Sequence, residues 1–171
     1  MSLIYYINCV DDILFNKNII SMKDIKAHGN ISCLEHSLFV SYVSYRVCRF
    51  LRWDYKAAAR GGLLHDLFLY NQFNKDNYKG FHLITHPATA LRNASSNFNL
   101  TEIEKDIIEK HMWPVTIKVP RYKESFIVNI TDTLCAVIEM LCLYNKMKVQ
   151  LKLDYLLSLI ESTASSTSPD N

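Results

Sequence analysis

Histidine and aspartate residues that could hold a metal ion recur in separate segments of this chain. The candidates are His36, the adjacent pair His65 and Asp66, and then His86, His111 and Asp132. Most have apolar or small neighbours three and four positions away, as on the inner face of a helix. An ionised carboxylate on such a face is costly unless a cation or several donors face it. Imidazoles and carboxylates gathered inside a helical bundle are typical of a metal centre.

The segments that carry these residues have the apolar spacing of helices, and no alternating stretch is long enough to demand a strand. We predict an all-α, single-domain bundle of about six to seven helices over residues 1–160, with a disordered Ser/Thr-rich tail at 161–171. The predicted helices cover approximately residues 11–22, 30–51, 54–70, 86–93, 101–113, 122–146 and 151–160.

Several residues indicate where the helices begin and how closely they pack. Asp54 is expected to cap one helix, and Thr101 opens another with a near capping box. Pro87 fits the first position of a helix, which would put His86 at its N-cap. The glycine pair 61–62 lies one turn before the His65–Asp66 pair, so another helix or a substrate could approach closely there.

Composition excludes several classes of protein. With 171 residues, 49% apolar and only 4 Gly and 4 Pro, the chain is not disordered, collagen-like or of low complexity. A formal charge of +2 is far from the basic footprint of a protein that binds duplex nucleic acid. The 5 cysteines form no C-x-x-C pair, which favours buried thiols in a reducing compartment. The start lacks a basic leader and a membrane-spanning run, so we expect a cytoplasmic protein without membrane contact.

The order of the candidate ligands resembles the HD-domain superfamily of metal-dependent phosphohydrolases. His36, then the string Gly62-Leu63-Leu64-His65-Asp66, then Asp132 follow the order of the family motif. The string His86-Pro87-Ala88-Thr89-Ala90 resembles the H-P-x-x-G/A element of the binuclear members, and His111 supplies their remaining histidine. The chain is similar to small phosphohydrolase-like proteins of Gram-positive bacteria.

This resemblance implies an HD-type fold with a motif core at about residues 30–145 and a centre for one or two divalent metal ions. One ion would be held by His36, His65, Asp66 and Asp132, and a second by His86 and His111 with Asp66 bridging. A carboxylate has two oxygens and can bridge, whereas an imidazole ligates through one nitrogen at a time. The nitrogen and oxygen donors suit Fe, Mn, Zn, Ni or Co. Likeness to the binuclear branch favours Fe or Mn.

The activity implied is hydrolysis of a small phosphorylated substrate, a nucleotide or another phosphate ester or anhydride, by a metal-activated water. The candidate catalytic residues are Asp66, Lys110 and Arg121, with Arg121 preferred as the cation that orients phosphate. Glu35 could orient the neighbouring His36 or be a surface glutamate. Two alternatives stay open, a non-catalytic metal- or nucleotide-binding module and a di-iron oxygenase. Leu/Ile-bearing faces could pair subunits into a homodimer or close a monomeric core.

Overall fold

Helices account for the regular structure of the described residues, which are 3–27, 31–70, 81–141 and 150–166 of a computed structural model. The elements in chain order are α1 (Ile4–Leu14), α2 (Lys17–Ile20), the 3-10 helix η1 (Ser21–Asp24), α3 (Cys33–Leu51), α4 (Tyr55–Leu64), α5 (His82–Asn97), α6 (Glu102–Lys110), α7 (Lys123–Met140) and α8 (Gln150–Ser166). The all-α prediction is therefore confirmed. None of the described helices is both long and apolar enough to cross a membrane.

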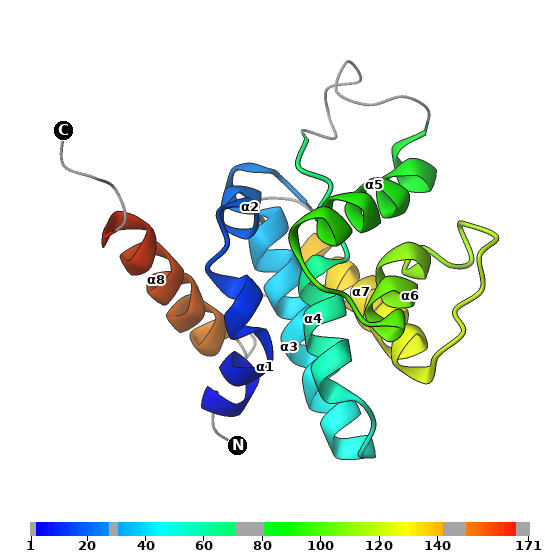
Figure 1. Ribbon diagram of the computed structural model, residues 1–171, viewed down its shortest axis with the longest axis horizontal. Helices are drawn as coiled ribbons and strands as arrows, with labels where there is room; N and C mark the ends of the chain where they lie inside the picture. The colour runs from blue at the N-terminus through cyan, green and yellow to red at the C-terminus, as the bar shows by residue number, and fades with distance from the viewer. Residues whose placement is uncertain (1–2, 28–30, 71–80, 142–149, 167–171) are drawn as a thin grey trace.

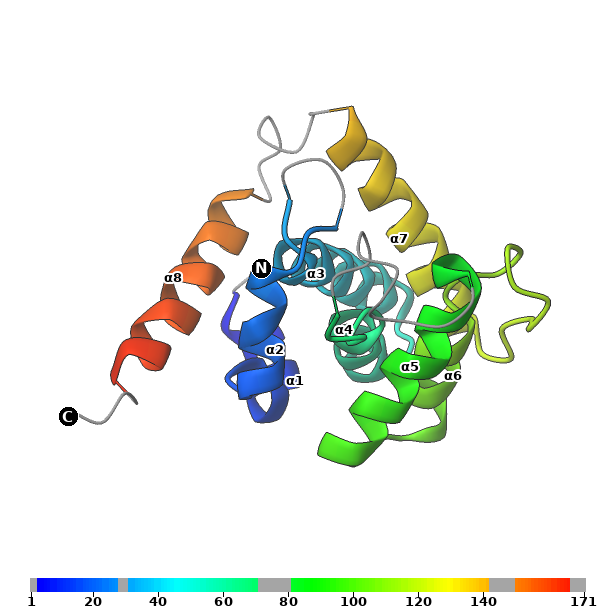
Figure 2. The same cartoon turned by 90° about the horizontal axis from the view of Figure 1, so that it is seen from above.

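Helices α3 and α4 form the centre of the bundle (Figure 1). Helix α3 also contacts α7 and α8, and α4 contacts α1, α6 and α7. Both views place α8 on the opposite side of the molecule from α5 and α6, with α1 between them (Figure 2). Apolar side chains of α1, α3 and α4 fill the core, among them the fully buried Tyr6, Phe39 and Leu63.

Glycine allows the two central helices to approach closely. A Cβ added at Gly62 would lie 2.9 Å from the backbone Cα of Ser41 on α3, and one added at Gly61 would lie 2.7 Å from Ile107 Cδ1 on α6. The Ser41 hydroxyl donates a hydrogen bond of 2.6 Å to the carbonyl of Ala59 across the same contact. The sequence prediction of close approach at this pair is confirmed, and the neighbours are helices.

Side-chain caps fix where α3, α4 and α6 begin. Ser32 and Glu35 form a capping box at the start of α3, and residues Thr101 and Glu104 form another at α6. Asp54 accepts a hydrogen bond from the backbone of Ala57 and caps α4. The caps predicted at Asp54 and Thr101 are confirmed. The Glu35 carboxylate accepts hydrogen bonds from Ser32 at the start of α3.

Other predicted boundaries need correction. The first predicted helix is divided, because α1 ends at Leu14 and the Asn16 side chain then accepts a hydrogen bond from the Asn18 backbone N–H and caps α2. Helix α5 begins at His82, so His86 lies inside it and Pro87 is not its first residue. The same helix continues to Asn97, through most of the turn expected at 93–99, and the Asn93 amide within it donates to the carbonyls of the 67–68 turn.

The ends of the later elements also differ from the sequence prediction. Helix α4 ends at Leu64, whereas the prediction continued it to Tyr70. Helix α8 places residues 161–166, which the sequence assigns to the disordered tail, in a helix. It is held by Leu153, Leu156 and Ile160, which are buried at three- and four-residue spacing. The predicted end of the sixth helix lies outside the described residues, because these exclude 142–149. The rest of the predicted tail, 167–171, lies outside them as well.

A Gly62→Ala substitution tests the close contact of α3 with α4. The added methyl group would meet the Ser41 backbone, which cannot move as a side-chain end could. We expect a loss of about 1–3 kcal/mol in the free energy of unfolding from overpacking, partly offset by roughly 1 kcal/mol of gained helix propensity. Denaturant unfolding of the two proteins measures the net loss. A variant more stable than the parent protein would contradict the contact.

Candidate metal centre

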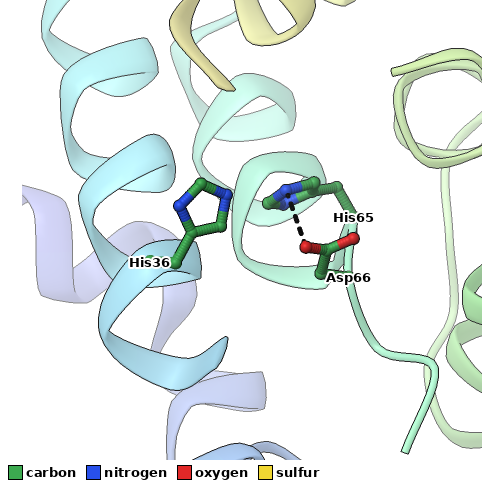
Figure 3. Close-up of side chains that lie close together, drawn as sticks. All are labelled: His36, His65 and Asp66. Atoms are coloured by element: carbon green, nitrogen blue, oxygen red, sulfur yellow. Dashed lines mark ion pairs between the residues drawn. The ribbon is translucent and has the colours of Figure 1, made fainter. Parts of the chain in front are cut away.

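The six predicted metal ligands lie together where five helices meet. His36 comes from α3, the His65–Asp66 pair directly follows α4, and His86 comes from α5. His111 directly follows α6, and Asp132 lies in α7. Figure 3 shows the His36 and His65 rings next to each other and the Asp66 carboxylate paired with His65. All four imidazoles are buried, and the Asp66 and Asp132 side chains keep 15% and 14% exposure.

The imidazole Nε2 atoms face the two carboxylates. His36 Nε2 lies 2.9 Å from Asp132 Oδ1, and His65 Nε2 lies 3.6 Å from the same oxygen. His65 Nε2 is also 3.5 Å from Asp66 Oδ2. The other Asp66 oxygen, Oδ1, lies 3.3 Å from His86 Nε2 and 3.6 Å from His111 Nε2. Asp66 thus faces both ends of the cluster through different oxygens, as a bridging carboxylate must.

Three overlapping groups of these residues have the proximity that a metal ion requires. They are His36, His65 and Asp66; His65, His111 and Asp132; and Asp66, His86 and His111. Within each group the candidate ligand atoms lie within 4.8 Å of one another. These buried groups could therefore hold a metal ion, and their nitrogen and oxygen donors do not select one transition metal over the others.

Each imidazole is oriented through its second nitrogen. The Nδ1 atoms of His65, His86 and His111 lie 2.8, 3.0 and 2.9 Å from the backbone carbonyls of Gly62, His82 and Ile108. The Nδ1 atom of His36 lies 2.9 Å from Glu139 Oε2. A carbonyl can only accept, so the Nδ1 atoms of His65, His86 and His111 donate and their Nε2 atoms face the centre. Such outer hydrogen bonds are typical of metal-ligating histidines.

The contacts inside the cluster fit a bound cation. His86 Nε2 and His111 Nε2 lie 2.8 Å apart, although both rings already donate through Nδ1. Two lone pairs at this distance repel each other unless a proton or a metal ion lies between them. His65 Nε2 and Asp66 Oδ1 are buried without a hydrogen-bond partner in the described part of the chain. Divalent ions would satisfy these atoms, so the residues present fit metal binding.

The electrostatics of the site keep both carboxylates ionised. Burial alone would raise the pKa of Asp66, but the neighbouring His65 and His86 hold it well below its usual range. Burial would also raise the pKa of Asp132, but the hydrogen bond with His36 and the nearby His65 imidazole lower it. Burial likewise lowers the pKa of His36, yet its hydrogen bonds with Asp132 and Glu139 raise it to about 10.

At the His86 end of the cluster, the pKa values of two histidines are lowered, in contrast to that of His36. Burial, followed by repulsion from His65 and His86, lowers the pKa of His111 to about 3. The His82 ring stacks on His86, with centroids 4.7 Å apart, and burial lowers its pKa to about 4. The Tyr70 hydroxyl lies 3.1 Å from His82 Nδ1. In the metal-free protein, His111 and His82 are therefore neutral near pH 7.

The cluster opens into a cavity of about 260 Å³. Its described lining consists of Ala27, Asp66, Phe68, His82, Leu83, His86, His111, Met112, Asp132, Thr133, Ala136 and Val137. Ligand atoms of both ends thus reach the cavity, and most of the other lining side chains are apolar. Such a mixture of apolar walls and few polar groups is typical of a small-molecule site.

The two predicted catalytic cations do not reach this cavity. Lys110 forms an ion pair with Asp106 on its own helix, and the Arg121 backbone N–H donates to Asp106 Oδ2 at 2.8 Å, while the Arg121 residue is exposed. Neither Lys110 nor Arg121 is among the described lining residues, and no other lysine or arginine is. Asp106 holds the Lys110 ammonium and the Arg121 backbone in this structure, and their role in orienting phosphate stays a prediction.

Sequence reasoning missed two residues that contact the cluster. Glu139 lies about two helical turns after Asp132 on α7, so the two share a face, and this spacing was the available signal. Glu35, the residue proposed to orient His36, instead accepts hydrogen bonds from the backbone and hydroxyl of Ser32. His82 was separated from His86 by the helix boundary expected at Pro87, but both lie in α5.

Comparison with protein-family models, curated proteins and solved structures finds no match. The geometry itself defines a buried histidine and aspartate cluster that could hold a metal ion and that opens into a cavity. Any activity is therefore inferred from the residues and contacts of this chain.

The metal-free protein should lose stability as the pH rises from about 6.5 to 8.5. The pKa of folded His36, about 10, lies above its ordinary 6.5, so the unfolded chain binds fewer protons in this range. The contribution is complete below pH 6.5 and lost as the pH approaches 10. Melting temperatures in the presence of a chelator measure the slope, and comparison with a His36→Gln variant separates it from thiols, whose ordinary pKa of about 8.5 lies at the upper end of this range. A His36→Gln variant that keeps the full slope would contradict this assignment.

Substitutions at Asp66 and His86 should separate the two ends of the centre. Asp66→Asn removes the carboxylate that faces both ends, so we expect weaker metal binding throughout. His86→Asn should weaken chiefly the end that contains His111. Metal content after equilibrium dialysis measures both effects, with losses of at least about 10-fold in affinity. Equal loss at both ends in His86→Asn would show that the division of ligands is wrong.

Proposed function

We propose that this chain is a metal-dependent phosphohydrolase of the HD-domain type, acting on a nucleotide or another small phosphate ester or anhydride. One observation carries the proposal. Four imidazoles and two carboxylates from five helices meet at one buried point, in the chain order of the family motif, and this point opens into a cavity. Isolated core histidines would find separate partners, whereas here their Nε2 atoms face shared carboxylate oxygens.

The residues of the cluster have distinct roles in this proposal. His36, His65, Asp66 and Asp132 would hold one divalent ion, and His86, His111 and Asp66 a second. Bound divalent ions would lower the pKa of a water nucleophile and neutralise phosphoryl oxygens during hydrolysis. The carbonyls of Gly62, His82 and Ile108 fix the ring orientations before substrate arrives. Phe68, Leu83, Met112 and Val137 would exclude water from around a bound substrate.

The lining of the cavity favours a second candidate, a metal-dependent binding module without turnover. No lysine or arginine is among the described lining residues, so within the described part of the chain only the ions would orient a phosphate. A protein that binds a phosphorylated ligand and does not hydrolyse it needs no further catalytic group. Metal-dependent ligand binding without product release would identify this alternative.

Release of inorganic phosphate from a panel of nucleotides and small phosphate esters tests the proposed activity. We expect release by protein loaded with Mn²⁺, Fe²⁺, Co²⁺, Ni²⁺ or Zn²⁺, with at least one metal active, because the ions activate water and neutralise charge. The double variant His65→Asn, Asp66→Asn is the control and should fall to background, since it lacks the residues at the middle of the cluster. Silence of the metal-loaded protein across the whole panel would overturn the hydrolase assignment.

A further inference from the structure

We infer that Glu139 is a positioning residue that makes the His36 end of the cluster the tighter of two unequal metal sites. The inference rests on the metal centre proposed above and deepens it. It concerns a side chain that touches no proposed metal position and acts through the His36 ring. Sequence position did not single it out, and its role follows from contacts within the folded chain.

Glu139 binds the outer face of His36 while Asp132 binds the inner face. Glu139 Oε2 lies 2.9 Å from His36 Nδ1, and Asp132 Oδ1 lies 2.9 Å from Nε2 of the same ring. The Glu139 side chain has 0% exposure and that of His36 has 1%, so little solvent screens this pair. The ring is therefore fixed in the orientation that presents Nε2 to the centre.

His36 differs from the other three histidines in the acceptor that holds it. Backbone carbonyls accept from Nδ1 of His65, His86 and His111, whereas an anionic carboxylate accepts from His36. A charged acceptor makes a stronger hydrogen bond and increases the electron density of the ring as a ligand. His36 is thus the imidazole with the strongest support for metal ligation in the described cluster.

The distribution of carboxylates also favours tighter cation binding at the His36 end. His36 pairs with both Asp132 and Glu139, whereas His86 pairs with Asp66 alone among the described carboxylates. Asp132 is shared to some extent, because one of its oxygens lies within 4.8 Å of a ligand atom of His111. Divalent cations are attracted more strongly to the end with the larger negative charge. The two ends would therefore fill in order, first at His36 and then at His86.

Packing alone does not explain the burial of Glu139. A buried carboxylate is expensive unless it is well paired, and Glu139 Oε1 has no hydrogen-bond partner in the described residues. A glutamine would fill the same volume and still accept from His36 without this charge. The carboxylate charge of Glu139 is explained if it supports a cation bound at Nε2, on the other side of the His36 ring.

Titration of the full-length, chelator-stripped protein with Co²⁺ tests the inference. Competition with a chromophoric chelator gives the affinities, and the visible spectrum of bound Co²⁺ reports the sites. We expect two classes of site in the parent protein. Glu139→Gln should weaken the tighter class by about 10- to 100-fold and leave the weaker class nearly unchanged, because the hydrogen bond is kept and the charge removed. In a His86→Asn background the remaining class should show the same loss on adding Glu139→Gln.

Glu124→Gln is the matched control. Glu124 lies on the same helix and, counted as a whole residue, is 3% exposed like Glu139. Its carboxylate accepts from the backbone of Asp54, away from the cluster. We expect it to bind Co²⁺ as the parent protein does. Circular dichroism melting verifies the fold of each variant. If Glu139→Gln does not fold, Glu139→Asp takes its place. This variant keeps the charge, so we expect a smaller loss of Co²⁺ affinity at the tighter class of site than for Glu139→Gln.

The outcomes separate this inference from the proposed function. A parent protein that binds no Co²⁺ would overturn the metal centre itself and the inference with it. Normal Co²⁺ binding by the parent with Glu139→Gln indistinguishable from Glu124→Gln would overturn only the role of Glu139. Loss of the weaker class instead of the tighter one would also overturn it, as would a Glu139→Asp variant whose tighter class is lost altogether.

Discussion

The attraction between buried carboxylates and imidazoles is the constraint on which the arrangement of α3 to α7 depends. Asp66 and Asp132 are ionised and largely removed from water, and each faces imidazole nitrogens supplied by other helices. Without an intervening cation these contacts leave His65 Nε2 and Asp66 Oδ1 without hydrogen bonds in the described chain. A bundle that gathers such groups pays a desolvation cost that metal binding would offset.

The packing of the helices and the positions of their ends determine where the histidine and aspartate side chains of the cluster lie. The missing side chains of Gly61 and Gly62 bring α4 against α3 and α6, one turn before the His65–Asp66 pair. His65 and His111 each directly follow a helix and bond back to a carbonyl of its last turn, at Gly62 and Ile108. The same interactions that end α4 and α6 therefore orient two ligands.

Much of this could be predicted from the sequence, because helix periodicity and caps are local signals. Asp54 and Thr101 cap the helices they were expected to cap, and the six histidine and aspartate candidates meet. Pro87 was misleading, since a proline near the start of a helix removes few hydrogen bonds and α5 includes it. The position of Glu139 depends on His36, a tertiary partner that local patterns do not encode. The pair of Lys110 with Asp106 is a local contact four residues apart on α6, so its spacing was visible in the sequence.

Metal analysis of the protein purified without chelators is the sharpest test of the proposed metal centre. We expect a transition metal bound in stoichiometric amount, one or two ions per chain, and its loss when His65 and Asp66 are both replaced. Protein that carries no metal, and takes up none when Mn²⁺, Fe²⁺, Co²⁺, Ni²⁺ and Zn²⁺ are supplied, would contradict it.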